Sequence, residues 1–225
     1  MPAPELRLVL AVSLDGRLAP AQGGAAQLGG TGDRRVLEEA LAWSDACLIG
    51  ARTLRLHGTT CLIHAPDLLE RRRCSQLPDQ PVAVVVSRSG DLDPALPFFR
   101  QPLPRWLLSP LDPADASPAA GFDRQLTLQH WPEALAALAD AGLRRLVLLG
   151  GAELAGQLLH EQLVDELQLT LCPQLLGGAH SWLPAALSLE PNRWTLQEQR
   201  ALGGDELLLR YRRLREPAPA LAPPP

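Results

Sequence analysis

Two adjacent glycines, Gly150 and Gly151, interrupt the sequence "LVLLGGAELAGQLL" at residues 146–159. An apolar run ends at this pair, and an apolar-rich helical pattern begins directly after it. A strand-to-helix turn offers backbone N–H groups at the positive end of a helix dipole, and two missing Cβ atoms leave room for a phosphate. Glycine also serves turns that need a positive φ and bind nothing. The pair therefore indicates either a pyrophosphate site or a plain corner.

Polar residues follow two earlier apolar runs at the points where those runs end. In "SLDGRLA" (13–19), Ser13 and Asp15 stand where the first run stops. The Asp-Gly dipeptide there is typical of a β-turn, and it can also act as a polar clamp. In "LIGARTLRLHG" (48–58) the run stops at Gly50, and four polar residues follow within six positions: Arg52, Thr53, Arg55 and His57. Two arginines beside a hydroxyl suit an anionic ligand, and a solvated loop is the alternative.

The sequence lacks the residues that lysine catalysis, catalytic triads and metal sites require. All 21 basic residues other than histidine are arginine, so a lysine Schiff base, a lysine general base and a P-loop lysine are excluded. The five histidines have no catalytic partners in the sequence, and no histidine–cysteine spacing is typical of a metal site. We therefore expect no bound metal. The zinc deaminase signature is also absent.

Composition indicates a globular protein with a sizeable core, because 46% of its 225 residues are apolar. A net charge of -4 argues against a nucleic-acid binder. The sequence shows no signal peptide or membrane span, so we expect a cytoplasmic chain with reduced thiols. Cys47 and Cys172 lie in apolar runs and are expected in the core. We expect one domain over residues 1–215 and a disordered, proline-rich tail over 216–225.

Strands and helices are predicted to alternate through most of the chain. Helices are expected at 33–44 (with Asp33 as N-cap), 66–76, 131–141 and 152–162. Strands are expected at 6–16, 45–50, 81–87, 143–149 and 165–172, with a further candidate at 105–109 and two late antiparallel strands at 194–199 and 206–213. This order predicts an α/β fold: a mostly parallel sheet with an antiparallel edge and helices on both faces. Ligands of such sheets bind at the carboxyl ends of the strands.

Five segments, taken in order, resemble the reductase domain of bacterial riboflavin biosynthesis. That family shares the dihydrofolate reductase fold and follows a zinc deaminase in the two-domain enzyme. The matching segments are "AVSLDG" (11–16), "DACLIGART" (45–53), "GGAEL" (150–154), "VDEL" (164–167) and "PQLLGG" (173–178). The resemblance spans residues 6–213 and makes the fold dihydrofolate reductase-like.

The resemblance implies NADPH-dependent reduction of a phosphoribosylamino-pyrimidine, whose ribose becomes a ribityl chain. The substrate would be 5-amino-6-(5-phosphoribosylamino)uracil or a close relative. Ser13 and Asp15 would lie near the nicotinamide, and Arg52, Arg55 and His57 would bind substrate or a phosphate. The implied cofactor contacts are Ala11, Gly50, Thr53, Ser87, Gly150, Gly151, Ala152, Glu153 and Leu154. Because the cofactor carries hydride chemistry, the missing triad does not argue against an enzyme.

Three departures from the family pattern leave the substrate open. Leu149 stands where the family has an acidic residue, His57-Gly58 where it has an Asp-x-Pro motif, and "AAQLGG" (25–30) where it has a tryptophan-containing segment. Reduction of another heterocycle, such as a pteridine, is one alternative. A paralogue that binds a nucleotide, or nothing, and serves a partner is the other. The family also implies a homodimer, for which exposed positions such as Leu167 and Leu169 could offer a sheet-edge interface.

Overall fold

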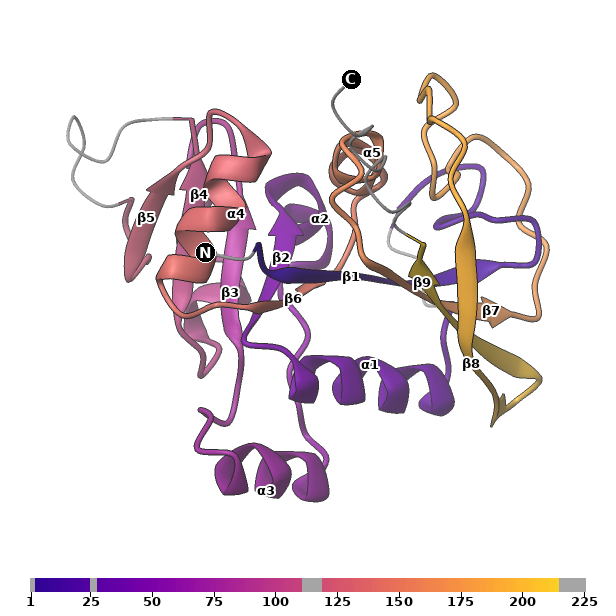
Figure 1. Ribbon diagram of the computed structural model, residues 1–225, viewed down its shortest axis with the longest axis horizontal. Coiled ribbons are helices and arrows are strands. Elements are labelled where there is room, and N and C mark those ends of the chain that lie inside the picture. The colour runs from indigo at the N-terminus through magenta and orange to yellow at the C-terminus, as the bar shows by residue number, and fades with distance from the viewer. Residues whose placement is uncertain (1–2, 25–27, 111–118, 215–225) are drawn as a thin grey trace, which may run out of the picture.

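A nine-stranded sheet organises the chain, as the computed structural model shows for residues 3–24, 28–110 and 119–214 (Figure 1). The strand order is β5-β4-β3-β2-β6-β1-β7-β9-β8. All pairs from β5 to β7 are parallel, whereas β9 and β8 are antiparallel. The bounds are β1 Glu5–Ser13, β2 Ala46–Gly50, β3 Val82–Val86, β4 Arg105–Ser109, β5 Arg124–Thr127, β6 Arg145–Leu148, β7 Glu166–Cys172, β8 Trp194–Gly203 and β9 Glu206–Arg213. The predicted fold class is confirmed.

Helices cover both faces of this sheet. They are α1 Thr31–Trp43, α2 Ala51–His57, α3 Pro66–Cys74, α4 Trp131–Asp140 and α5 Ala152–His160, with a short 3-10 turn at Pro97–Arg100. Leu6, Leu8 and Leu10 of β1 pack in one core with α4 and α5. Val9, between them, packs against α1 on the opposite face. Because β1 lies in the middle of the sheet and is covered on both faces, its sequence is a continuous apolar run.

The sequence did not indicate two short elements, α2 and β5. The helix α2 has seven residues and ends at Gly58, which adopts a left-handed φ of +72°. Only Ala51 and Leu54 are buried in it, too few for a helical period to show. The strand β5 has four residues, none of them fully buried, at the edge of the sheet. Its upstream neighbours, residues 111–118, lie outside the described residues, as does the predicted tail over 216–225.

The alternation of polar and apolar residues in β7 predicts a half-exposed strand, and this prediction is wrong. Its polar residues Glu166, Gln168 and Thr170 are all buried because they face α1, and the Gln168 amide donates to the Val36 carbonyl of that helix. Leu167, on the other face, is only 9% exposed and belongs to the core. Since β7 lies between β1 and β9, it is not an edge strand, and Leu167 cannot form the predicted sheet-edge interface.

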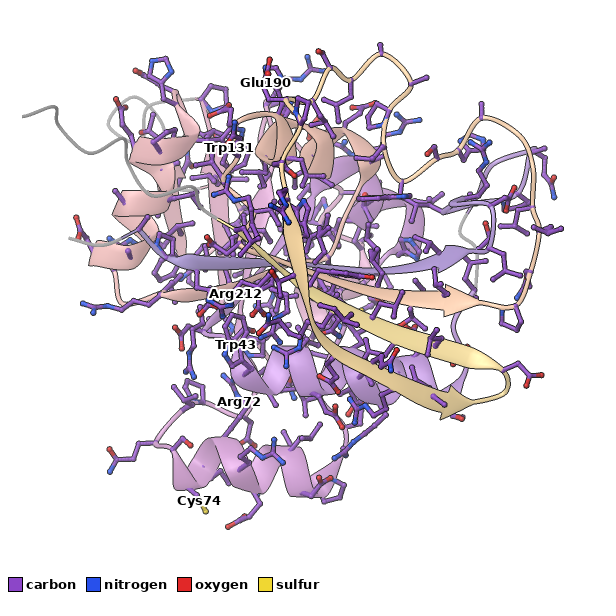
Figure 2. The ribbon with its side chains drawn as sticks, turned by 45° about the vertical axis from the view of Figure 1, so that its right-hand side comes forward. Trp43, Arg72, Cys74, Trp131, Glu190 and Arg212 are labelled. Atoms are coloured by element: carbon purple, nitrogen blue, oxygen red, sulfur yellow. The ribbon has the colours of Figure 1, made fainter. Side chains whose placement is uncertain are left out.

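Two buried charged side chains hold the ends of α1. Asp33 was predicted as the N-cap, which was wrong: Gly30 has that position, and no side chain adjacent in sequence caps it. The Glu206 carboxylate of β9 accepts instead from the backbone N–H groups of Gly30 and Asp33, the latter at 3.1 Å. At the other end, the Arg72 guanidinium of α3 donates to the carbonyls of Leu41, Ala42 and Ser44 (Figure 2). The negative Glu206 lies at the positive end of the helix dipole and the positive Arg72 at its negative end, so both charges stabilise the helix.

Arg72 offers a direct test of this arrangement. The side chain is 1% exposed, and its Nε also donates to the Pro78 carbonyl at 2.6 Å. Arg72→Met would leave several buried carbonyls without donors, and we expect it to lower the free energy of unfolding by about 2–3 kcal/mol. Urea unfolding measures this, with Arg71→Met on the exposed face of α3 as the control, expected to change stability by less than about 0.5 kcal/mol. Equal effects of the two variants would contradict this role of Arg72.

A buried carboxylate, Glu166, ties β1, β7 and β9 together. It is 1% exposed and lies 2.8 Å from Arg7 Nε, 2.8 Å from Arg212 Nη2 and 3.5 Å from Arg210 Nη1. The Arg7 guanidinium also stacks over the Trp43 ring, with its Cζ 4.0 Å from the ring centroid. Figure 2 shows Trp43 near Arg212. Burial by itself raises the pKa of Glu166, but the three arginines outweigh it, so the pKa lies below its ordinary value.

This lowered pKa predicts acid sensitivity. Glu166 stabilises the fold above the ordinary carboxyl pKa of about 4.5, and this contribution is lost as the pH falls through the lower, folded value. We expect the stability of Glu166→Gln to decline less than that of the wild type between about pH 5 and pH 3. Urea unfolding at several pH values tests this, and Glu190→Gln, an exposed position, should follow the wild type. Parallel pH profiles for Glu166→Gln and the wild type would rule out the effect.

Candidate active site

The carboxyl ends of the parallel strands meet at one edge of the sheet, and there the sequence-predicted residues gather. β1 ends at Ser13, β2 at Gly50 and β6 at Leu148; α2 begins directly after β2, and α5 begins after the short turn that follows β6 (Figure 1). Leu8 pairs with Leu148, so β1 continues five residues beyond the end of β6 and on to Ser13. Because β6 is shorter than β1, the edge of the sheet is recessed above Leu148. We call this recess the step, and the turn at Gly150-Gly151 lies in it.

Both glycines of that turn are required by geometry. Gly150 and Gly151 have φ of +87° and +76°, a region that other residues rarely adopt. A Cβ at Gly150 would lie 2.9 Å from Leu10 Cδ2, and one at Gly151 would lie 2.7 Å from Thr53 Oγ1. Gly151 is also the N-cap of α5, with no side-chain cap. The turn thus presents the first backbone N–H groups of α5 beside the Thr53 hydroxyl.

The first turns of α2 and α5 lie next to each other at this step. Gly50 approaches Leu154, since a Cβ on the glycine would lie 3.8 Å from Leu154 Cδ2. Arg52 Nη1 lies 2.9 Å from Glu153 Oε1, and both side chains are largely exposed. An exposed ion pair of this kind contributes little to stability, so Arg52 can exchange Glu153 for a ligand phosphate at small cost. Ala152 is the first residue of α5, directly after the turn.

Ser13 and Asp15 form a clamp rather than two free polar groups. The Ser13 hydroxyl donates to Asp15 Oδ1 at 2.5 Å and accepts from the backbone N–H of Arg17 at 2.8 Å. The Asp15 carboxylate also accepts from the backbone N–H groups of Leu176 and Gly177. The hydrogen bond from Ser13, followed by the one from Leu176, holds the pKa of Asp15 well below its usual range. Asp15 therefore ties the end of β1 to the "PQLLGG" segment.

A second polar group surrounds the end of β3. Ser87 is buried, and its Oγ accepts from the backbone N–H of Gly90 at 3.1 Å. Arg55 Nη2 donates to the Asp91 carbonyl of the same turn. Arg88, between them and exposed, makes no ion pair with any residue that the structure describes. Arg88 is not among the sequence-predicted site residues, and its one signal in the sequence is its place directly after a buried strand.

His57 shares the short helix α2 with Arg52 and Arg55, the other predicted substrate residues. It is the last residue of α2 and is exposed, five positions from Arg52 at the start of that helix. Leu149, which stands where the family has an acidic residue, packs in the core. Its side chain is half-buried against the cluster of Val9, Ala40 and Val147 under α1. The structure thus gives Leu149 a place in the core beside the site.

A cavity of about 370 Å³ lies elsewhere, between α1 and the amino ends of β1 and β7. It is lined by charged residues, including Arg7, Glu166, Arg200 and Arg210, which form the ion pairs described above or pairs with Glu39 and Glu198. None of the sequence-predicted site residues lines it. Because its charges are already paired and it lies at the opposite edge from the strand ends, the candidate active site is the carboxyl edge.

The family model of the RibD C-terminal domain matches residues 4–208. The chain belongs to the RibD C-terminal domain family. It is 28% identical over 92% of its length to the riboflavin biosynthesis protein RibD of Haemophilus influenzae, and it spans 58% of that relative. It is 26% identical over 78% of its length to the 2,5-diamino-6-ribosylamino-4(3H)-pyrimidinone 5′-phosphate reductase of Methanothermobacter thermautotrophicus, of which it covers 80%.

Solved structures confirm the dihydrofolate reductase-like fold. A pyrimidine reductase-like protein of Corynebacterium diphtheriae superposes with a TM-score of 0.77 at 20% identity, covering 95% of this chain and 93% of the other. A dihydrofolate reductase of Enterococcus faecalis superposes with a TM-score of 0.50 at 16% identity, covering 93% of this chain and 96% of the other. The family model therefore confirms the family resemblance drawn from the five sequence segments, and these structures confirm its fold.

Metal and membrane sites find no support among the described residues. Within residues 3–24, 28–110 and 119–214, no group of three or more His, Cys, Asp or Glu residues could hold a metal ion. In the same part of the chain, no helix is long and apolar enough to cross a membrane. All four cysteines are free, and Cys47 and Cys172 are buried as predicted.

The tight contact at Gly151 yields a prediction. Gly151→Ala combines an unfavourable φ with a Cβ 2.7 Å from Thr53 Oγ1, whereas Gly142→Ala has a φ of +93° and open space around it. We expect Gly142→Ala to cost about 1 kcal/mol and Gly151→Ala about 2–4 kcal/mol in urea unfolding. Adding Thr53→Ala should recover part of the second loss, because it removes the clashing oxygen. Equal losses at both glycines would show that the turn does not pack against Thr53.

Proposed function

We propose that this chain is an NADPH-dependent reductase of the riboflavin pathway. Its substrate would be 5-amino-6-(5-phosphoribosylamino)uracil or a close pyrimidine relative, whose ribosyl group becomes a ribityl chain. The observation that carries the proposal is the Gly150-Gly151 turn beside Thr53 at the carboxyl edge, in a chain of the RibD C-terminal family. One relative is named for riboflavin biosynthesis, and the name of the other gives a reductase of a phosphorylated ribosylamino-pyrimidinone.

The cofactor would lie along the step in the sheet edge. Its pyrophosphate would contact the backbone from Gly150 to Leu154, including Ala152 and Glu153, with Gly50 and Thr53 opposite. When bound, NADPH would supply the hydride that replaces the ring oxygen on C1′ of the ribose. That oxygen takes a proton and becomes the hydroxyl of the open chain. Positioning matters most in such a reaction, because the cofactor carries the chemistry.

The residues at the end of β1 would position the reacting ends. Ala11 and Ser13 would line the nicotinamide side, with Asp15 acting through the loop that it holds. Arg52, Arg55 and His57 would face the substrate or a phosphate from α2. Because Asp15 is held as a carboxylate by several donors, its role is to order the "PQLLGG" segment.

The choice of NADPH over NADH rests on the end of β3. Arg88 and Arg55 flank the turn that starts at Ser87, and no carboxylate within the described residues pairs with either guanidinium. A 2′-phosphate needs such a cationic, hydrogen-bonding group, and arginine recognises phosphate better than other side chains do. We assign the 2′-phosphate to this turn.

Cofactor binding can be followed by quenching of the five tryptophans. We expect NADPH to bind at least about tenfold more tightly than NADH, and Arg88→Gln to remove most of that preference. Arg144→Gln, an exposed arginine at the start of the segment leading into β6, should leave the preference intact. Oxidation of NADPH on addition of the pyrimidine then tests the reaction. If no nicotinamide cofactor binds below about millimolar, weaker than ~-4 kcal/mol, the reductase proposal is lost.

We also propose that the chain forms a homodimer in the cytoplasm, through the sheet face opposite α1. Leu169 pairs with Leu209, and Leu196 pairs with Tyr211, so these side chains share that face. Leu196 is 43% exposed and Leu207 is 36% exposed. Light scattering should give a dimeric mass, which Leu207→Arg lowers to the monomer and Leu175→Arg, at an exposed leucine after β7, does not. A monomeric wild type would refute the dimer.

A further inference from the structure

The cavity between α1 and the amino ends of β1 and β7 holds hydrogen-bond donors that its own ion pairs do not use. Its volume of about 370 Å³ lies within the range of small-molecule sites. Val36 and Ala40 of α1 lie on one side of it, and the sheet on the other side carries arginines and carboxylates. The cavity is therefore polar toward the sheet and large enough for a small organic molecule.

Arg7 is a buried guanidinium of this cavity with donors to spare. It is 9% exposed, and Glu166 is the one carboxylate within ion-pair distance of it among the described residues. That carboxylate is shared, because Arg210 and Arg212 contact it as well. Arg7 Nε donates to Glu166, whereas Nη1 and Nη2 donate to no acceptor in the described part of the chain. Neither Nη atom is fully buried, so both open to the cavity that Arg7 lines.

The Trp43 ring fixes the plane of the Arg7 guanidinium. The Arg7 Cζ lies 4.0 Å from the ring centroid, and Figure 2 shows Trp43 at the end of α1. An arginine that is already stacked on an aromatic ring loses little further freedom when it binds a ligand. Burial lowers the pKa of Arg7, and the charge of Glu166 opposes this effect. A second anion at the two Nη atoms would likewise stabilise the buried positive charge.

An unused acceptor, the Gln168 amide oxygen, lies near Arg7. Gln168 is 4% exposed and lines the same cavity, and its amide nitrogen donates to the Val36 carbonyl. Its Oε1 accepts no hydrogen bond from any described residue. Since Gln168 follows Glu166 by two positions on the same face of β7, its Cα lies roughly 7 Å further along the strand. A ligand that uses both Arg7 and Gln168 needs an anionic group at one end and a donor at the other.

We propose that this cavity binds a small organic carboxylate that carries a hydroxyl group at its far end. The carboxylate would accept from both Nη atoms of Arg7, and the hydroxyl would donate to Gln168 Oε1. The body of the ligand would pack against the apolar side chains of α1. A carboxylate is favoured over a phosphate because its single charge is repelled less by Glu39 and Glu198 of the cavity wall. The site lies at the opposite edge of the sheet from the proposed reductase site and does not rest on that function.

Calorimetry with 4-hydroxybenzoate tests the site, with 4-hydroxybenzamide as the uncharged match and benzoate as the match without the hydroxyl. We expect 4-hydroxybenzoate to bind with a Kd below about 1 mM, at least about tenfold more tightly than the amide. Benzoate should bind about threefold to tenfold more weakly than 4-hydroxybenzoate, because it makes no hydrogen bond to Gln168. A Kd of 4-hydroxybenzoate above about 1 mM, or an amide that binds as tightly, overturns the proposal.

Two variants test whether the ligand lies in this cavity. Arg7→Lys keeps the positive charge beside Glu166 but removes the paired Nη atoms, and it should weaken 4-hydroxybenzoate binding at least about tenfold. The matched control is Arg145→Lys, because Arg145 also lies over the Trp43 ring, at 6.0 Å, and is not among the residues that line the cavity. Gln168→Met should bind benzoate and 4-hydroxybenzoate equally, because it has no amide oxygen.

Each comparison has an outcome that contradicts the site. Equal losses in Arg7→Lys and Arg145→Lys overturn the role of Arg7. If Arg7→Lys does not fold, Gln168→Met decides, and a retained preference for the hydroxyl compound overturns the proposal. Displacement of 4-hydroxybenzoate by NADPH would place the ligand at the carboxyl edge of the sheet, and tighter binding of inorganic phosphate would change the ligand class, so either result also overturns it.

Discussion

The helix α1 is held at both ends by buried side chains from distant parts of the sequence, and the site depends on this constraint. Glu206 of β9 accepts from the first turn, and Arg72 of α3 donates to the last carbonyls. Each charge is favoured by the dipole at its own end, so the helix cannot slide along the sheet without losing both. In between, the Glu38 carboxylate accepts from the backbone N–H groups of His64 and Ala65, which docks the start of α3.

In a chain that has no lysine, arginine side chains make the buried hydrogen bonds and ion pairs that hold the fold together. Arg72 satisfies carbonyls, and Arg7, Arg210 and Arg212 neutralise Glu166. The planar, multiply donating guanidinium suits both tasks, whereas an ammonium group would satisfy fewer partners. Ion pairs continue from Arg210 through Glu198 and Arg200 to Glu39 on α1. This network joins the antiparallel edge to the helix and leaves Arg88, at the other end of the sheet, without a partner carboxylate among the described residues.

The pairing of the strands brings residues from distant parts of the sequence to one edge of the sheet. Since β1 extends past the end of β6, the step above Leu148 lies between β1 and β2, and the glycine turn enters it. Thr53 and Gly151 come from separate parts of the sequence and lie together because parallel strands end at one edge, where β1 also ends at Ser13. The same geometry explains Leu149, which turns toward the core beneath α1.

The sequence by itself determined the layered α/β fold, the family and the strand-end segments. Long apolar runs such as Pro81–Ser87 and the amphipathic pattern of Trp131–Ala141 carry that information locally, through the periods of strand and helix. The need for glycine at Gly150 and Gly151 was also visible, as one of two alternatives. Only the tertiary structure decided between burial and exposure for polar residues of β7, since alternation cannot show that a helix covers the polar face. It likewise showed that the carboxylate of Glu206, more than 170 positions away, and not that of Asp33, accepts from the first turn of α1, because capping groups can come from any segment that packing brings close.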